Sequence, residues 1–242
     1  MNRTLSASEI AFQGGPPSAG LERKSITPKW RWFSLAEFLL GAVLVIAHNV
    51  YRLIPNEVPI LAGLGLISLR LREKSWRGMG LGIPASWRRT VWIALAAAAV
   101  RLLVGMLVIE PMTAHFWPSA TPPSGMHEIT GNLKVALQWF LFIWAFAAFG
   151  EETGYRGYLI NRAADVGGRS KLAYWIAVLA VSVLFGYGHF YKGPAGMLDS
   201  GIAGLILGTT YLISGRNLWA CILAHGFIDT VGIIALFFGW SS

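Results

Sequence analysis

The chain has 242 residues, of which 55% are hydrophobic and only 13% are charged, and its mean hydropathy is +0.53. A soluble domain normally carries about a quarter of its residues as Asp, Glu, Lys or Arg, so the composition excludes an ordinary soluble protein and indicates an integral membrane protein. The net charge of +8 comes from basic residues spread between apolar runs, which argues against nucleic-acid binding and favours contact with anionic membrane lipids. The single cysteine, Cys221, excludes an internal disulfide and a cysteine-based zinc site.

The first 29 residues are rich in Ser, Gly and Pro and lack the apolar core of a signal peptide, so we expect a disordered or interfacial tail. The rest of the chain predicts an all-α, polytopic membrane protein of about seven to eight transmembrane helices, because a spanning helix needs about 20 mostly apolar residues. The seven apolar runs are Phe33–Val50, Val58–Leu71, Val91–Ile109, Val135–Leu159, Leu172–Phe190, Met197–Ser214 and Leu218–Trp240.

After the tail, the chain divides into two parts. Residues 30–132 hold the first three apolar runs and a Pro-rich, polar segment, Pro111–Asn132, which we expect to be the longest loop. Residues 133–242 hold the remaining four runs and all the candidate functional groups described below. The run Val58–Leu71 is short for a membrane span, so it is expected to be tilted, re-entrant or in a thinned bilayer.

The distribution of Lys and Arg predicts the orientation of the protein. With seven spans and a cytosolic N-terminus, the outer segments keep only Arg52, Lys134 and Lys192, as the positive-inside rule requires. If the short run Val58–Leu71 does not cross the membrane, every later segment changes side. The lack of a long soluble region favours the inner membrane of a bacterial cell.

Charged residues stand at the end of the run that begins at Val135. Ionisable groups within spans are energetically costly, so each is a candidate for function. Glu152 and Arg156 are four residues apart and can pair along one helix face, which leaves Glu151 to point elsewhere with Tyr155 one turn further on. A buried carboxylate near a guanidinium can act as a general base, and the alternative is an ion pair at a helix end.

Histidines follow in two later runs. The stretch "FGYGHFY", Phe185–Tyr191, places His189 one turn after Phe185 between small residues, and its alternative is a histidine of the interfacial aromatic belt. The stretch "LAHGFIDT", Leu223–Thr230, places His225 and Asp229 on one helix face, where the carboxylate can orient the imidazole. Its alternative is a polar pair that joins helices.

Together, Glu151, His189 and His225 offer one carboxylate and two imidazoles from three separate runs. Such a set can surround one water molecule, or it can bind a divalent metal ion such as zinc. The ligand types permit a metal without requiring one. The chain contains no H-E-x-x-H sequence, so it is not a zincin.

These three groups, in this order and spacing, resemble the three motifs of the CPBP family. They read E-E-x-x-x-R, F-x-x-x-H and H-x-x-x-D and begin at residues 151, 185 and 225. The family comprises intramembrane proteases, among them the type II CAAX prenyl endopeptidases, and bacteriocin-processing Abi proteins. The resemblance covers roughly residues 135–240, and "GRNLWACILAHGFID", Gly215–Asp229, is similar to the third-motif region over its whole length.

The resemblance implies helices around a conical cavity open toward the cytosolic leaflet, and it implies hydrolysis of a peptide bond. Glu151 would activate water and His189 and His225 would assist, with either glutamate-only or metal-dependent chemistry. The family's third motif often ends in Asn where this chain has Asp229, which orients His225 or helps to hold a cation. The supporting residues are Glu152, Tyr155, Arg156 and Phe185.

Other functions remain open at the level of sequence. The substrate is expected to be an apolar peptide or a membrane-associated or lipidated protein. A non-catalytic protein of bacteriocin self-immunity or partner binding could use the same scaffold. A proton-coupled transporter would need an inverted repeat, which we do not find. A lipid-modifying enzyme would need more cations than Arg101.

Depth in the membrane poses a problem for a shared site. At about 1.5 Å per residue, Glu151 and His225 lie roughly 15 Å from the nearest inner basic residues. His189 lies about 27 Å from Lys171, too far for a simple perpendicular helix. A shared site therefore requires the fifth run to begin outside the hydrocarbon region and the loop Lys192–Gly196 to enter the protein.

Overall fold

A computed structural model describes residues 27–73, 75–117 and 126–240, and these residues form helices and no strand. The all-α fold class is therefore confirmed. The tail predicted for residues 1–29 lies almost entirely outside the described residues. The α-helices are α2 (Pro28–Asn49), α3 (Glu57–Glu73), α4 (Trp87–Val104), α5 (Glu110–Phe116), α6 (Leu133–Phe142), α7 (Ile160–Val166), α8 (Lys171–Tyr187), α9 (Gly193–Ile213) and α10 (Leu218–Phe237). The 3₁₀- and π-helical segments are η1 (Trp76–Met79), η2 (Gly105–Ile109), η3 (Met126–Ile129), η4 (Ile143–Leu159) and η5 (Phe190–Lys192).

Several helices are long and apolar enough to cross a membrane, so the protein is a polytopic membrane protein. Five such helices occur among the described residues: Pro28–Asn49, Trp87–Phe116, Leu133–Val166, Phe190–Ile213 and Leu218–Phe237. The helix α8 is apolar but shorter, and α3 combines 17 residues with charges at both ends. The count of seven to eight spans and the orientation therefore stay predictions.

The third apolar run continues further than the sequence predicted. The helices α4, η2 and α5 form one stretch of 30 residues that ends at Phe116, so the loop predicted to begin at Pro111 is wrong for its first turn and a half. Pro111 comes directly after the π-helical segment η2 inside this continuous stretch, and π-helical turns are a common feature where a proline interrupts the bonding of a helix. Residues 118–125 of the predicted loop lie outside the described residues.

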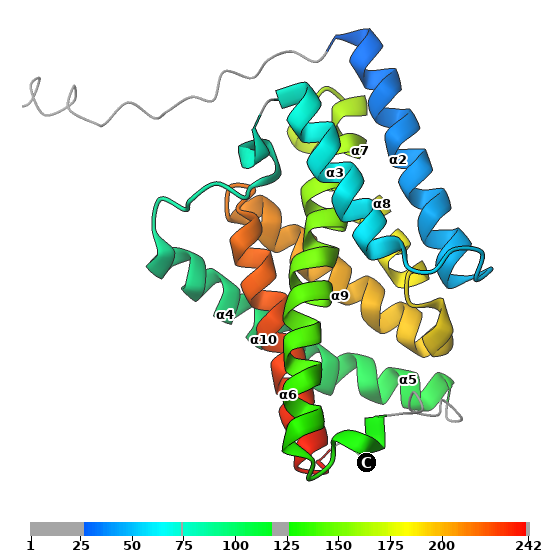
Figure 1. The fold of residues 1–242 in the computed structure, drawn as a ribbon, viewed down its shortest axis with the longest axis vertical. Helices are drawn as coiled ribbons and strands as arrows, with labels where there is room; N and C mark the ends of the chain where they lie inside the picture. Colours follow the sequence, from blue (N-terminus) through cyan, green and yellow to red (C-terminus); the bar gives the residue numbers. More distant parts are fainter. Residues whose placement is uncertain (1–26, 74, 118–125, 241–242) are drawn as a thin grey trace, which may run out of the picture.

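One long helix, built from α6, η4 and α7, forms the axis of the molecule (Figure 1). The helix α10 runs beside it, while α9 crosses at a slant and α3 packs against η4. Gly154 makes the α3 contact close, since a Cβ atom there would lie 3.0 Å from the Cβ of Leu61. The other helices therefore approach the segment that carries the two glutamates from several sides.

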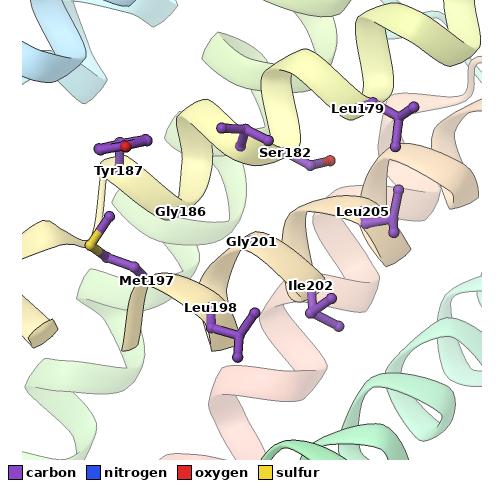
Figure 2. A pocket seen from close by; sticks show the side chains of 10 residues that line it. Leu179, Ser182, Gly186, Tyr187, Met197, Leu198, Gly201, Ile202 and Leu205 are labelled. Carbon is purple, nitrogen blue, oxygen red and sulfur yellow. The ribbon is translucent and has the colours of Figure 1, made fainter. Parts of the chain in front are cut away.

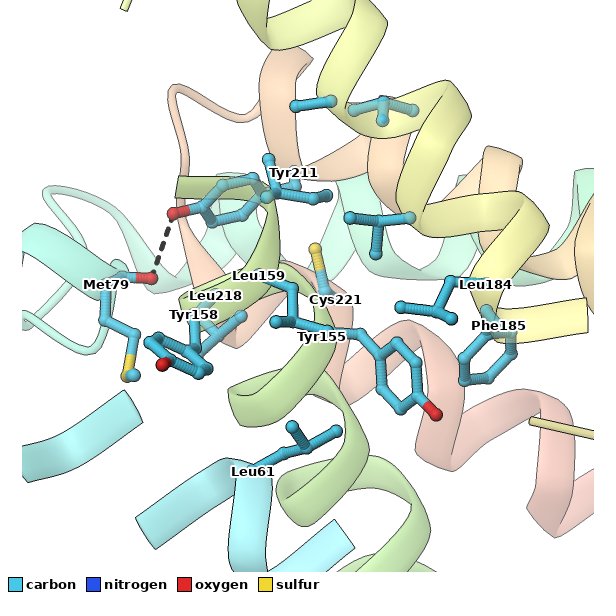
Figure 3. Packing of buried hydrophobic residues seen from close by; sticks show 14 of the residues in the cluster. Leu61, Met79, Tyr155, Tyr158, Leu159, Leu184, Phe185, Tyr211, Leu218 and Cys221 are labelled. Atoms are coloured by element: carbon cyan, nitrogen blue, oxygen red, sulfur yellow. Dashed lines mark hydrogen bonds between the residues drawn. The ribbon is translucent and has the colours of Figure 1, made fainter. Parts of the chain in front are cut away.

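The apolar core surrounds this segment (Figure 3). Tyr155, Tyr158 and Leu159 of η4 pack among buried side chains of α3, α8 and α10. The Tyr211 hydroxyl donates a 3.1 Å hydrogen bond to the carbonyl of Met79, which joins α9 to η1. The segment η4 is thus held rigidly, as positioning of reactive groups requires.

The connection between α8 and α9 differs from the predicted one. The helix α8 ends at Tyr187, and the predicted loop Lys192–Gly196 is mostly the first turn of α9, with Pro194 at its start. Gly193 has φ of +72°, a left-handed conformation that favours glycine, and it allows η5 to pass directly into α9. His189 therefore lies at a tight helix-to-helix turn.

A groove of about 330 Å³ lies between α8 and α9 (Figure 2). Its lining is almost entirely apolar and includes Leu179, Tyr187, Met197 and Ile202. The candidate catalytic residues lie outside this lining.

Candidate active site

The first motif lies on a widened helical turn. The backbone of η4 is π-helical, and at its end the N–H of Ile160 bonds to the carbonyl five residues back, at Tyr155. Such winding is rare and occurs mostly at functional sites. Glu152 and Arg156 are fully buried on this segment, whereas Glu151 is half-buried.

Glu152 is the centre of a buried hydrogen-bonded group. Its Oε1 accepts a 2.9 Å hydrogen bond from Nη1 of Arg156, which forms the pair that the sequence indicated. The same oxygen lies 2.7 Å from Nδ1 of His225, a contact that the sequence analysis missed. The other oxygen, Oε2, has no hydrogen-bond partner among the described residues. Glu152 therefore joins the first motif to the third.

His225 lies between two carboxylates. Its Nδ1 faces Glu152, and its Nε2 lies 3.4 Å from Oδ2 of Asp229, four residues further along α10. An ionised carboxylate only accepts hydrogen bonds, so an imidazole with hydrogens on both nitrogens satisfies both contacts. That form is a cation, and the negative charges on either side stabilise it.

His189 belongs to the same site through Phe185. The Nδ1 of His189 lies 2.9 Å from the Phe185 carbonyl, so Nδ1 donates and Nε2 keeps a lone pair. The Phe185 ring has its centroid 4.8 Å from the ring of His189 and 6.4 Å from the ring of His225, and the Arg156 guanidinium lies 4.4 Å from that centroid. The turn after α8 brings His189, and α10 brings His225, to the same aromatic ring.

Glu151 differs from its neighbour. Among the residues that the structure describes, its carboxylate takes part in no hydrogen bond, while its charge interacts with those of His225, Asp229 and Glu152. Tyr155, on the following turn, directs its hydroxyl to Oε1 of Glu57 at 3.3 Å. A carboxylate that is near a cationic imidazole but uncommitted can bind and deprotonate a water molecule.

The described residues do not fit the metal-ion alternative. They contain no group of three or more His, Cys, Asp or Glu side chains arranged to hold a metal. Both ring nitrogens of His225 face carboxylates, and one nitrogen of His189 faces a carbonyl. We therefore derive no step through a metal, and the ligand set of Glu151, His189 and His225 stays a prediction.

Sequence analysis also missed a second buried carboxylate, Glu57, together with His48 and Asn49. The available signal was a glutamate directly before an apolar run, shortly after two polar residues near the end of the previous run.

The predicted cation Arg101 pairs with Asp199 at 2.6 Å, across α4 and α9, so it does not lie at the candidate site.

These features define a helical membrane protein with a buried carboxylate–histidine site. Residues 133–231 match the family model for type II CAAX prenyl endopeptidase Rce1-like proteins. This segment of the chain is therefore similar to that family of intramembrane CAAX proteases. The segment contains all three motifs, whereas Glu57 lies outside it. No curated protein and no solved structure matches the chain.

Proposed function

We propose that the protein is an intramembrane endopeptidase that hydrolyses a peptide bond of a membrane-associated or lipidated substrate. The observation that carries this proposal is an uncommitted carboxylate, Glu151, within electrostatic range of His225, whose ring contacts Phe185 as the ring of His189 does. The hydrogen bonds of the two imidazoles give them opposite capacities. Nε2 of His189 accepts, whereas His225 donates. General acid–base catalysis of hydrolysis needs both capacities next to one carbonyl group.

Water is activated on the side of Glu151 and His189. The Glu151 carboxylate takes a proton as the water oxygen attacks the peptide carbonyl, and Nε2 of His189 orients the water by accepting a hydrogen bond. The bond from water oxygen to carbonyl carbon then forms a tetrahedral intermediate. Glu151 returns the proton to the amide nitrogen, the C–N bond breaks, and an acid and an amine leave.

The developing oxyanion is stabilised on the side of His225. The cationic imidazole donates to the oxyanion through Nε2, whose present contact with Asp229 is long at 3.4 Å and therefore readily exchanged. Glu152 keeps the ring in place through Nδ1, and Arg156 holds the Glu152 carboxylate by donating to the same oxygen. Asp229 then orients the His225 imidazole.

The setting of the site favours an apolar or lipid-bearing substrate. The site lies on helices that are apolar enough to span a membrane, so a substrate must reach it from the bilayer or its surface. Membrane lipids are thus the surrounding partners, with the N-terminus in the cytosol and the inner membrane of a bacterium as the proposed location.

The proposal is tested with purified protein in detergent and a library of internally quenched apolar peptides. Glu151→Gln should abolish cleavage without loss of folded protein, since Glu151 has no hydrogen bond to lose within the described residues. Glu110→Gln is the matched control, because it makes the same change on a membrane helix outside the candidate site, at a side chain with no hydrogen bond or ion pair within the described residues. Cleavage by Glu151→Gln at the wild-type rate would overturn the proposal.

A further inference from the structure

A second buried polar cluster adjoins the site and is formed by the turn between α2 and α3. Glu57 begins α3 and is only 4% exposed. Its Oε1 accepts a 2.8 Å hydrogen bond from Nδ2 of Asn49, and Nε2 of His48 lies 3.5 Å from Oε2. The other ring nitrogen of His48 lies 2.8 Å from the Ile54 carbonyl, so His48 spans the turn. Burying a carboxylate costs free energy, and contacts with three neighbouring side chains offset that cost for Glu57; Asn49 and His48 are two of them.

Tyr155 is the third neighbour, and it connects Glu57 to the candidate site. The hydroxyl of Tyr155 donates to Oε1 of Glu57 at 3.3 Å. Tyr155 is 2% exposed, and its hydroxyl also lies within electrostatic range of Glu151, one turn earlier in η4. A Cβ atom on Gly188 would lie 2.8 Å from this hydroxyl, so the backbone just before His189 passes directly over it.

Tyr155 also fixes the ring around which the histidines lie. Its ring meets Phe185 edge-on, with centroids 4.9 Å apart and planes at 87°. Phe185 in turn contacts the rings of His189 and His225. Movement of Tyr155 would therefore change the position of both imidazoles relative to Glu151.

We propose that Glu57, held by His48 and Asn49, is a positioning residue that acts through Tyr155 on the geometry of the site. The inference rests on the proposed peptidase function. It assigns a role in the reaction to α2 and α3, which lie outside the segment that matches the family model. Glu57 contacts no reacting atom, and its effect passes through the Tyr155 hydroxyl and the Phe185 ring.

A double-mutant cycle tests this connection with the quenched peptide that the wild type cleaves. Glu57→Gln and Tyr155→Phe should each lower kcat by about 10-fold, because small displacements of catalytic groups are costly, while KM stays nearly constant. The double variant should lose no more than either single variant, since both weaken the same contact: glutamine lacks the charge that strengthens it, and phenylalanine lacks the hydroxyl. A merely structural role would lower the folded fraction and leave kcat per folded molecule unchanged.

Two matched controls separate the contact from general damage. Tyr158→Phe removes a hydroxyl from the same helix, on the side that packs against Gly65 and Met79, and should keep the wild-type kcat. Glu73→Gln removes the carboxylate at the other end of α3 and should do the same. If Glu57→Gln does not fold, His48→Gln replaces it, because His48 is more exposed and contacts the same carboxylate.

The inference would be overturned by an unchanged kcat in Glu57→Gln, or in His48→Gln where that variant replaces it. It would also be overturned if the kcat losses of the two single variants multiplied in the double variant. In each case, loss of cleavage in Glu151→Gln would still support the proposed peptidase function. Wild-type cleavage by Glu151→Gln would instead remove the proposed function, and this inference with it.

Discussion

Two clusters of charged side chains are each centred on the same long helix, Leu133–Val166, and they differ in how completely their carboxylates are paired. The site cluster consists of Glu151, Glu152, Arg156, His225 and Asp229. The anchor cluster consists of Ser34, Glu37, Arg72, Arg162, Asp165 and Arg169. Both are within apolar helices, so each must compensate the cost of its charges.

The anchor cluster pairs its central carboxylate on both oxygens. Oδ2 of Asp165 accepts from Ser34 at 2.8 Å and from Arg162 at 2.6 Å, and Oδ1 accepts from Arg169 at 2.5 Å. Burial alone lowers the pKa of Arg169, but the carboxylates of Asp165 and Glu73 outweigh it and raise that pKa above its ordinary value. Arg169 therefore stays charged, and the hydrogen bond from Ser34 to Asp165 joins α2 to α7.

The site cluster leaves its carboxylates incompletely paired. Both bonds to Glu152 fall on one oxygen, and the second oxygen has no partner among the described residues. Glu151 forms no hydrogen bond within the same part of the chain. A carboxylate paired on both oxygens, such as Asp165, stabilises a fold, although two nitrogens of Arg162 beside it have no hydrogen-bond partner among the described residues. An incompletely paired carboxylate retains the capacity to bind and react. The comparison therefore assigns stability to Asp165 and chemistry to Glu151.

Apart from Glu151→Gln, the largest effect on the chemistry is expected for His189→Ala. Loss of the water-orienting nitrogen should lower kcat by about 1,000-fold, within the range for general acid–base groups. The folded fraction should stay near that of the wild type, because the ring donates only to a backbone carbonyl of its own turn. Single-turnover cleavage of the quenched peptide measures the loss, and a kcat within twofold of wild type would exclude His189 from the reaction.

The largest effect on stability is expected for Asp165→Asn. Removing this charge leaves the buried guanidinium of Arg162 without its 2.6 Å partner, which should cost about 3–5 kcal/mol of unfolding free energy. Cleavage per folded molecule should not change. Thermal unfolding in detergent, followed by an assay of the folded fraction, separates the two quantities. A lower kcat at unchanged stability would contradict the division between the clusters.

A smaller effect is expected for Asp229→Asn. The contact of Asp229 with His225 is long, and an asparagine keeps an oxygen acceptor in the same place. Cleavage should fall by less than about 10-fold, the equivalent of one hydrogen bond. A loss as large as that of His189→Ala would mean that the charge of Asp229 takes part in the chemistry.

The smallest effect is expected for removal of metal ions. Treatment with a chelator should leave the cleavage rate unchanged, because no three ligating side chains converge within the described residues. Loss of cleavage that returns on addition of zinc would contradict this expectation. It would instead support the ligand set of Glu151, His189 and His225.

The sequence predicted the helices well and the contacts between distant segments only in part. Apolar runs of about 20 residues predict helices because a membrane leaves the backbone few alternatives. The i, i+4 spacing also predicted the pairs of Glu152 with Arg156 and of His225 with Asp229, since such spacing fixes local geometry. Local rules of this kind need no knowledge of tertiary packing.

The remaining features depend on tertiary packing, which the spacing of residues along the sequence does not specify. The bond from Glu152 to His225 joins helices that are 73 residues apart in the chain. The π-helical winding of η4 and the turn at Gly193 change the direction of side chains that an ideal α-helix would place elsewhere. Glu57 was missed for the same reason, because only the fold brings it to Tyr155.

The most direct test of the central claim compares Glu151→Gln with Glu152→Gln, assayed side by side as kcat per folded molecule. The account predicts that Glu151→Gln loses all measurable cleavage while remaining folded. Glu152→Gln should lose stability and about 10- to 100-fold in rate, as expected for a residue that orients a catalytic group. The reverse order would contradict the account, because it would identify Glu152 as the base and Glu151 as its support.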